Sequence, residues 1–411
     1  MNQDTFENKI IPWIGTLWFL VSINSFFLWF EFGRIIRYIA FLGMLYASLM
    51  LSKKFKATIY NLPIFLSLLF YFLWSLGFID NQYALIIKIL NFIPLFLLLF
   101  WPKNVFNNCY EILRKVIIFF AIGSSIVSVL SFVGVLEYLP HFTFEGRSAL
   151  HQSRGIVYYV YGAFVTSYSV IGGISSRACG PLQEPGHWGI ILGLFYLIDW
   201  YALKKRNNWI IICGILTFSS GFWAMFLFVE IFNLFSKKAF GKTILYMSTI
   251  IIALFIILLL LPQNTKDDVT YLLFGRNLEN VYENFEETGS LDDALDVRAS
   301  NFSLNRYNNL RFDEYLFGTG YRDTSAALSD YRGTILYMGL IGFILSIIPS
   351  FLIIRRANWR LAISLFLSLF LIYLHRGWML FSSYIYFLAF LAVTLSTMPR
   401  VETEKYLVKQ E

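Results

Sequence analysis

Long apolar runs, separated by short polar segments, recur along nearly the whole of the 411-residue chain. A helix of about 20 apolar residues is long enough to cross the hydrocarbon core of a bilayer. The pattern therefore predicts an all-α, polytopic integral membrane protein with about 12 transmembrane helices. The expected crossings are residues 10–30, 35–51, 60–79, 84–100, 116–136, 188–203, a short broken pair within 209–235, 243–261, 333–354, 361–374 and 378–397.

Basic residues in the connecting segments orient these crossings. Segments 52–56, 204–206, 237–242 and 355–360 are rich in Lys or Arg, and such segments remain on the cytoplasmic side. Both termini are then cytoplasmic, and the two longest loops are external. The expected organisation is transmembrane helices in 1–136, a first external loop in 137–187, transmembrane helices in 188–261, a second external loop in 262–332, transmembrane helices in 333–397 and a cytoplasmic tail in 398–411.

Two segments depart from the simple pattern. Residues 156–174 are moderately apolar but rich in Tyr, Gly, Ser and Thr; a crossing there would invert every later loop, so we expect external strands or an interfacial segment. Residues 209–235 have basic flanks on both sides, so they cross an even number of times. The polar run 217–221 is expected to break them into two half-spans too short to cross a full bilayer. Their turn should be buried in protein or line a water-filled recess at the outer face.

Composition excludes a soluble globular protein. Apolar residues make up 57% of the chain and charged residues 14%, whereas soluble domains carry about 25% charged residues. The formal charge of +7 would suggest a nucleic-acid partner in a soluble protein. Here the basic residues lie in short loops between crossings, so we expect the protein to be embedded in a membrane and to have no nucleic-acid partner. Cys109, Cys179 and Cys213 fall at different depths, and no disulfide is expected.

The candidate chemistry begins in residues 177–189, where Arg177, Glu184 and His187 lie among two Gly/Pro turns. Gly and Pro at this density favour a tight non-helical path, which can hold Arg177 and Glu184 in set directions above a helix. The alternative is an ordinary loop that starts the next helix.

Arginines are frequent in both external loops, and a planar guanidinium suits phosphate oxygens. Alternatively, these arginines pair with nearby carboxylates in a solvated loop. We find no metal-ligand spacing, P-loop, Gly-x-Ser-x-Gly or redox Cys pair, so neither metal nor cofactor is expected. Lys88, Asp199 and Glu230 lie within crossings and are candidates for a transport path; for the two carboxylates, snorkelling at the inner face is favoured.

The layout and several short motifs resemble the O-antigen polymerase (Wzy) family, within the wider O-antigen polymerase/ligase group. Two long external loops follow the fifth and ninth crossings. The motifs are Arg177-x-x-Gly180 before Glu184-Pro185-Gly186, Thr217-x-Ser219-x-x-Phe222, and Gly318-Thr319-Gly320 before Ser329-Asp330 and a glycine-rich tenth crossing.

This resemblance implies a GT-C-like glycosyltransferase in the bacterial inner membrane, active at the periplasmic face. It would polymerise O-antigen or capsule repeat units, moving the growing glycan from undecaprenyl diphosphate to a lipid-linked repeat unit. The implied partners are these lipid-linked oligosaccharides, membrane lipid and a protein that regulates chain length. The implied diphosphate-binding residues are Arg177 and Arg298, with Arg306 or Arg311 as alternatives to Arg298.

Glycosyl transfer also needs a base for the acceptor hydroxyl, and Glu184, His187 and Asp330 all remain candidates. Activity should be independent of metal, because arginines can stabilise the diphosphate. One alternative is an O-antigen ligase that uses lipid A core, although related ligases tend to have a His-Asn pair where this chain has Asp330-Tyr331. The other is a transporter of lipid-linked oligosaccharides, which should show internal repeats with discontinuous helices in both halves.

Overall fold

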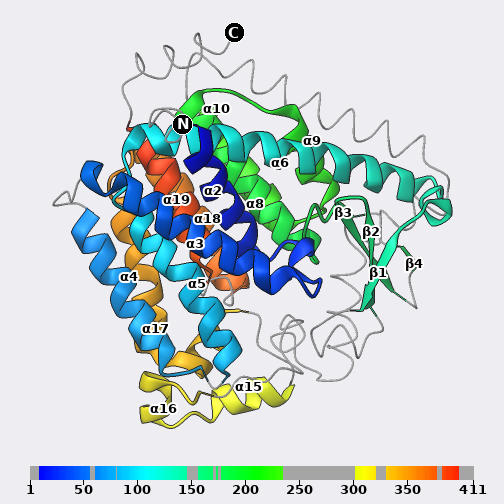
Figure 1. Cartoon of the computed structure of the whole chain (residues 1–411). Helices are drawn as coiled ribbons and strands as arrows, with labels where there is room; N and C mark the ends of the chain where they lie inside the picture. Colours follow the sequence, from blue (N-terminus) through cyan, green and yellow to red (C-terminus); the bar gives the residue numbers. More distant parts are fainter. Residues whose placement is uncertain are drawn as a thin grey trace.

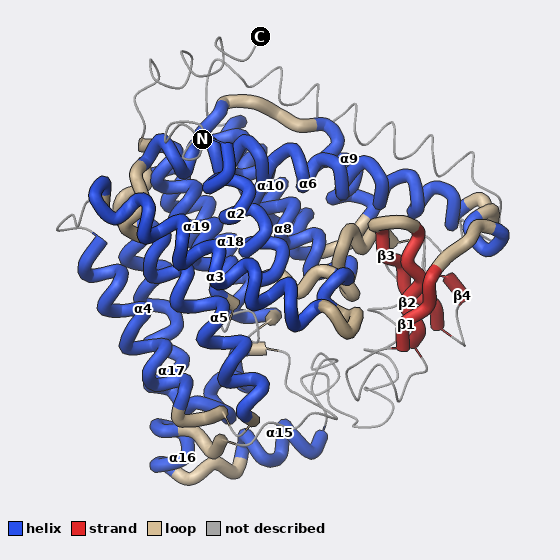
Figure 2. The backbone as a smooth tube through the Cα atoms, in the orientation of Figure 1, coloured by secondary structure: helices blue, strands red, loops and turns tan. Residues whose placement is uncertain are grey.

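The computed structural model describes residues 9–55, 61–79, 81–145, 156–169, 173–174, 177–234, 301–320, 330–376 and 382–397. This part of the chain is mostly helical, with a small sheet beside the helical bundle (Figures 1 and 2). The α-helices are α2 (Ile11–Ser22), α3 (Gly33–Leu51), α4 (Asn61–Leu76), α5 (Gln82–Leu98), α6 (Lys103–Phe132), α8 (Pro185–Ile198), α9 (Asn208–Leu216), α10 (Ser220–Leu234), α15 (Asn301–Asn308), α16 (Phe312–Phe317), α17 (Tyr331–Ile354), α18 (Trp359–His375) and α19 (Ser383–Ser396).

Three described helices are long and apolar enough to cross a membrane. They lie in Gly33–Lys54, Lys103–Phe132 and Tyr331–Ile354, and the other apolar helices are shorter. The expected helical membrane protein is supported at this level, whereas about 12 crossings and a GT-C-like fold stay predictions. The expected crossing at 243–261 and most of the second external loop lie outside the described residues.

The first crossing was expected to extend to residue 30, but α2 ends eight residues earlier. Asn24 is left-handed (φ 58°), and the Ser25 N–H donates to the Leu20 carbonyl. The Asn24 side chain then accepts a hydrogen bond from Arg37 of α3 at 2.7 Å. A polar contact between neighbouring helices therefore ends a helix that the apolar pattern alone would continue.

The fifth crossing was expected to start at residue 116, but α6 begins at Lys103 and runs unbroken for 30 residues. Arg114 lies within it and donates to the buried carboxylate of Asp199 at 2.7 Å. Because its charge is paired, the arginine is accommodated inside the bundle.

Helix α8 lies at the centre of the bundle, packed against α9, α10 and α19. Nearly every residue from Trp188 to Ile198 is buried, as expected of a helix that is apolar on all sides. Gly193 lies against Met225 of α10, where a Cβ would come within 2.6 Å of the Met225 sulfur. Small residues of this kind let two helix backbones approach closely.

The segment expected to form strands or an interfacial piece is a sheet. Strands β1 (Phe142–Glu145), β2 (Ile156–Tyr161), β3 (Phe164–Ser169) and β4 (Gly173–Ile174) pair antiparallel in that order. Gly162, with φ 64°, supplies the tight turn between β2 and β3. Phe164 packs against Gly123 of α6, which attaches the sheet to the bundle. The all-α description thus applies to the bundle and not to this loop.

Candidate functional site

The segment before α8 follows a fixed, non-helical path. The Ala178 N–H donates to the Leu216 carbonyl at the end of α9, at 2.9 Å. The carbonyls of Gly180 and Pro181 accept from the N–H groups of Val165 and Phe26, at 2.9 and 2.8 Å. Three parts of the chain therefore hold this segment, which is tighter than an ordinary solvated loop.

Arg177 contacts the predicted break between α9 and α10, and the structure has that break at residues 217–219. Its Nε donates to the Thr217 carbonyl at 2.9 Å, and its Nη2 donates to the Phe218 carbonyl at 3.1 Å. The last carbonyls of a helix lack intrahelical partners and carry partial negative charge. The guanidinium therefore caps α9 through these contacts with the main chain.

Two glycines allow the segment and the break to meet. Gly180 is left-handed (φ 61°), and a Cβ there would overlap the ring of Trp188. At Gly189 a Cβ would lie 2.5 Å from the Cβ of Ser219. Ser219 in turn donates from Oγ to the Gly186 carbonyl at 3.3 Å. The first turn of α8 and the α9–α10 break therefore form one packed unit.

Glu184 forms an ion pair with Arg376, which lies just after α18. The Arg376 Nη1 and the Glu184 Oε2 are 2.6 Å apart, and the two side chains are 22% and 40% exposed. A side chain on Gly186 would overlap the Arg376 guanidinium. Sequence reasoning did not select Arg376 as a site residue. The sequence did contain an indication: Arg376 is a basic residue in a turn expected to be external, and the positive-inside rule disfavours basic residues on that side.

His187 lies in the first turn of α8, one residue before the expected crossing at 188–203. Its Nε2 is 2.5 Å from the hydroxyl of Tyr384 on α19. Burial lowers the pKa of His187 from 6.5 to about 3; Arg376 also lowers it, whereas Glu184 raises it. The imidazole is therefore neutral at physiological pH and is a weak base.

These contacts define one group of side chains, here named the α8 cluster. Arg177 and Glu184 come from the segment before α8, His187 from its first turn, and Arg376 and Tyr384 from the far end of the chain. The Glu184–Arg376 ion pair and the imidazole of His187 therefore lie at the start of one buried helix, and Arg177 is bonded to the α9–α10 break that packs against the same turn. This arrangement can bind an anion and accept a proton.

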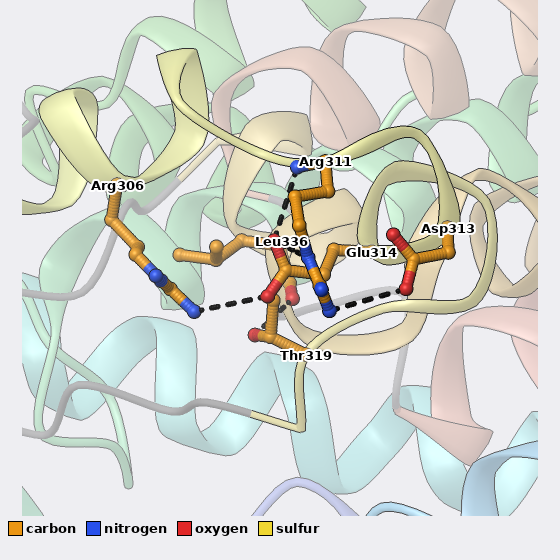
Figure 3. Close-up of polar contacts among 6 residues, drawn as sticks. All are labelled: Arg306, Arg311, Asp313, Glu314, Thr319 and Leu336. Carbon is orange, nitrogen blue, oxygen red and sulfur yellow. Dashed lines mark hydrogen bonds and ion pairs between the residues drawn. The ribbon is translucent and has the colours of Figure 1, made fainter.

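The second loop places its arginines differently, as Figure 3 shows. Arg306 donates to Glu314 at 3.2 Å, and Arg311 donates to Asp313 at 3.2 Å. The arginine side chains are 44% and 73% exposed. For these two residues the structure shows the alternative considered above, pairing with loop carboxylates. Arg298 lies outside the described residues, so its predicted convergence with Arg177 stays a prediction.

Asp330 caps the first turn of α17. Its Oδ1 accepts from the Arg332 N–H at 2.9 Å, and its Oδ2 pairs with the Arg332 guanidinium at 2.5 Å. Both carboxylate oxygens therefore have donors within the same turn. These contacts make Asp330 a weaker candidate for the base than Glu184.

The Gly318-Thr319-Gly320 motif packs into a kink of α17. The kink is at Gly339, where φ is 74° inside the helix. The N–H groups of Thr319 and Gly320 donate to the carbonyls of Leu336 and Tyr337, at 3.0 and 3.1 Å, and the Thr319 hydroxyl also donates to Leu336 (Figure 3). The motif therefore satisfies carbonyls that the kink leaves without helical partners.

The two carboxylates expected to snorkel are instead buried and paired. Asp199 is bonded by Arg114 and Tyr110, and Glu230 by Arg206 and Tyr196. Because a buried charge is costly unless paired and hydrogen-bonded, these contacts explain how both carboxylates are accommodated. They link α6 to α8 and α10 to the segment after α8.

Lys88 shows a different arrangement. Its Nζ lies 5.4 Å and 5.7 Å from the ring centroids of Tyr71 and Phe92, a geometry that favours cation–π attraction. Among the described residues, no three His, Cys, Asp or Glu side chains are grouped as metal ligands would be.

The chain thus presents a bundle of apolar helices with the α8 cluster at the start of its central helix. Outward-directed arginines of the second loop form a separate set at the start of α17. Comparisons of the chain with family models, with curated proteins and with solved structures find no match.

Proposed function

We propose that this chain is a polysaccharide polymerase of the bacterial inner membrane. It transfers a growing glycan from undecaprenyl diphosphate to a lipid-linked repeat unit at the periplasmic face, with both termini cytoplasmic. The α8 cluster carries the proposal, because a partly exposed carboxylate paired with Arg376 precedes a buried helix, and Arg177 is bonded to the α9–α10 break that packs against the first turn of that helix. The motif resemblance supplies the reaction class.

The arginines would stabilise the leaving diphosphate. As the bond between the sugar and the diphosphate breaks, negative charge grows on the leaving oxygen. A guanidinium already in place stabilises that charge more in the transition state than in the ground state. Arg177 and Arg376 are the arginines of the cluster, and their contacts with carbonyls and with Glu184 hold them in position.

Glu184 is the proposed base. It would accept the proton of the acceptor hydroxyl as that oxygen attacks the anomeric carbon. His187 has a pKa of about 3, and a base so weak is poorly matched to reaction near neutral pH. Asp330 is engaged on both oxygens by Arg332. Glu184 is also paired, with Arg376, but its side chain is 40% exposed whereas that of Asp330 is 15% exposed, so an acceptor can reach Glu184 more easily.

The decisive experiment is reconstitution of the purified protein with lipid-linked repeat units in the presence of EDTA. A ladder of polymer is expected, and Glu184→Gln and Arg376→Ala should each reduce its rate by about 10²-fold or more. The control is Arg34→Ala, which removes an exposed arginine that lies over Tyr83, and it should retain the ladder. Wild-type protein that makes no ladder, or whose ladder requires added metal, would contradict the proposal.

The same assay separates the alternatives. A ligase would need lipid A core as acceptor and would leave repeat units unpolymerised without it. A transporter would move lipid-linked units across proteoliposomes without changing their length.

A further inference from the structure

A cavity lies beyond the end of α8 that is opposite the α8 cluster. It has a volume of about 380 Å³ and opens among the end of α8, the end of α10 and the start of α18. The lining residues relevant here are Tyr201, Lys204, Phe232, Asn358, Trp359 and Arg360. None of them belongs to the α8 cluster, which lies at the other end of α8.

The cavity favours an anion. Lys204 and Arg360 line it, and no described lining residue is acidic. Two buried carboxylates lie nearby in the sequence. Asp199 comes five residues before Lys204, and Glu230 lies in the last turn but one of α10. They are held by Arg114 and Arg206, at 2.7 and 2.6 Å. Acidic side chains close to the cavity are therefore already neutralised by other partners.

The backbone adds to this positive potential. Asn358 caps α18, and its Oδ1 accepts from the Leu361 N–H at 3.0 Å. The first N–H groups of the 17-residue helix, at Trp359 and Arg360, lack intrahelical acceptors. The positive end of the helix dipole therefore points toward the cavity beside the two cations.

Lys204 is held in an unusual conformation. Helix α8 continues into a π-helical turn, Asp199–Leu203, which ends at Lys204 with φ 56° and ψ 30°. Few residues other than Gly adopt this conformation, and π-helical turns often occur at functional sites. The Lys204 Nζ lies 5.5 Å from the Tyr201 ring centroid, so the turn places its cation at the aromatic wall of the cavity.

An apolar surface continues away from the cavity along two neighbouring helices. Phe232 and Trp359 make an edge contact across them at 6.2 Å. Exposed apolar side chains follow on both helices; they are Leu227 and Ile231 on α10, and Ile363, Phe366 and Phe370 on α18. The three on α18 continue from Trp359 at steps of four, three and four residues, so they share one helix face.

From this combination we infer that the cavity binds the phosphate headgroup of an anionic phospholipid. Lys204, Arg360 and the start of α18 hold the phosphate, and the acyl chains lie along the exposed apolar faces of α10 and α18. Aromatic rings at the cavity mouth suit the boundary between headgroups and hydrocarbon. Basic pockets between membrane helices are known to bind such headgroups. The adjoining apolar faces favour a phospholipid over a free phosphate ion as the ligand.

The test is native mass spectrometry of the detergent-purified full chain with phosphatidylglycerol, phosphatidylcholine or inorganic phosphate. Wild type should retain phosphatidylglycerol in preference to phosphatidylcholine. Replacing both cations, as Lys204→Ala with Arg360→Ala, should weaken that binding about 30-fold, because each basic residue near an anionic headgroup contributes about a fivefold change in affinity. The exchanged pair Lys204→Arg with Arg360→Lys should keep most of the affinity.

The matched control is Lys53→Ala with Arg355→Ala. It removes the same two charge types from exposed positions outside the cavity and should bind phosphatidylglycerol as wild type does. Equal loss in both double variants would show attraction by surface charge alone and would overturn the site. Displacement of the lipid by inorganic phosphate at equal concentration would assign a free anion and would overturn the lipid assignment. Neither result depends on polymerase activity.

Discussion

At the scale of single residues, the α8 cluster combines positions that the chain separates widely. Arg376 lies 192 residues after Glu184, yet their side chains form an ion pair. Arg177 caps α9 with the same guanidinium that the proposed reaction would use. A side chain fixed by structural contacts is preorganised, which is the condition for stabilising charge in a transition state.

We predict that Arg177→Ala reduces the rate of polymer formation by about 10²–10³-fold. Arg177→Lys should fail nearly as badly, because an ammonium lacks the planar fork that spans two carbonyls or two phosphate oxygens. The measurement is ladder formation by protein shown to be inserted and monodisperse. A full ladder from the Ala variant would remove Arg177 from the mechanism.

His187 gives a prediction about pH. The pKa of His187 is about 3 in the folded protein and 6.5 when the imidazole is not buried. Between pH 3 and pH 6.5 the unfolded chain therefore binds more protons than the folded chain. Stability should therefore fall as pH falls through this window. We expect the thermal midpoint to drop by a few degrees between pH 7 and pH 5, and His187→Gln to show a smaller drop. His141→Gln, on the loop before β1, should drop as wild type does; equal drops in all three proteins would refute the assignment.

At the scale of elements, glycines and buried ion pairs decide how the helices meet. Asp199 and Arg114 join α8 to α6, and Glu230 and Arg206 join α10 to the segment after α8. Gly318 and Gly339 let α16 and α17 approach closely. A Cβ at Gly318 would overlap the backbone nitrogen of Gly339, and a Cβ at Gly339 would overlap the carbonyl oxygen of Leu316. The kink in α17 is therefore stabilised by contacts with the preceding loop.

We predict that Gly339→Ala destabilises the protein. Its φ of 74° with ψ of 172° lies in a region that is essentially restricted to Gly, at a cost of about 1–3 kcal/mol for an L-residue, and the new Cβ would overlap the Leu316 carbonyl. The thermal midpoint should fall by several degrees, and polymer formation should fall with it. Gly77→Ala, where the nearest atom to a new Cβ is 3.4 Å away, is the control and should change little. An unchanged midpoint for Gly339→Ala would show that the kink is not required.

At the scale of the whole molecule, the described helices form a bundle with the first turn of α2 and the last turn of α19 at the same end (Figure 1). Helices α15 and α16 lie at the opposite end. The orientation of these two ends relative to a membrane and the total number of crossings both stay predictions.

We predict about 12 crossings with loops 137–187 and 262–332 both external. Reporter fusions after Ser176 and Gly289 should both give the external signal, and a fusion after Lys205 should give the cytoplasmic one. A cytoplasmic signal at either external position would overturn the map.

The sequence by itself determined the helical membrane character, since apolar runs of this length have few other stable environments than a bilayer. It also located the α9–α10 break, because polar residues interrupt an apolar run. For residues 156–174 their polar and aromatic composition argued against a crossing and left strands or an interfacial segment as the two alternatives. These are local properties, and local patterns report them well.

Only the tertiary structure decided the end of α2, the continuity of α6 and the membership of the α8 cluster. Each depends on a partner distant in sequence: Arg37 for Asn24, Asp199 for Arg114, and Arg376 for Glu184. Hydrophobic periodicity shows which face of a helix is buried, but it does not show which polar group lies opposite. The pairing of charges across helices arises from packing, and packing is a property of the folded chain.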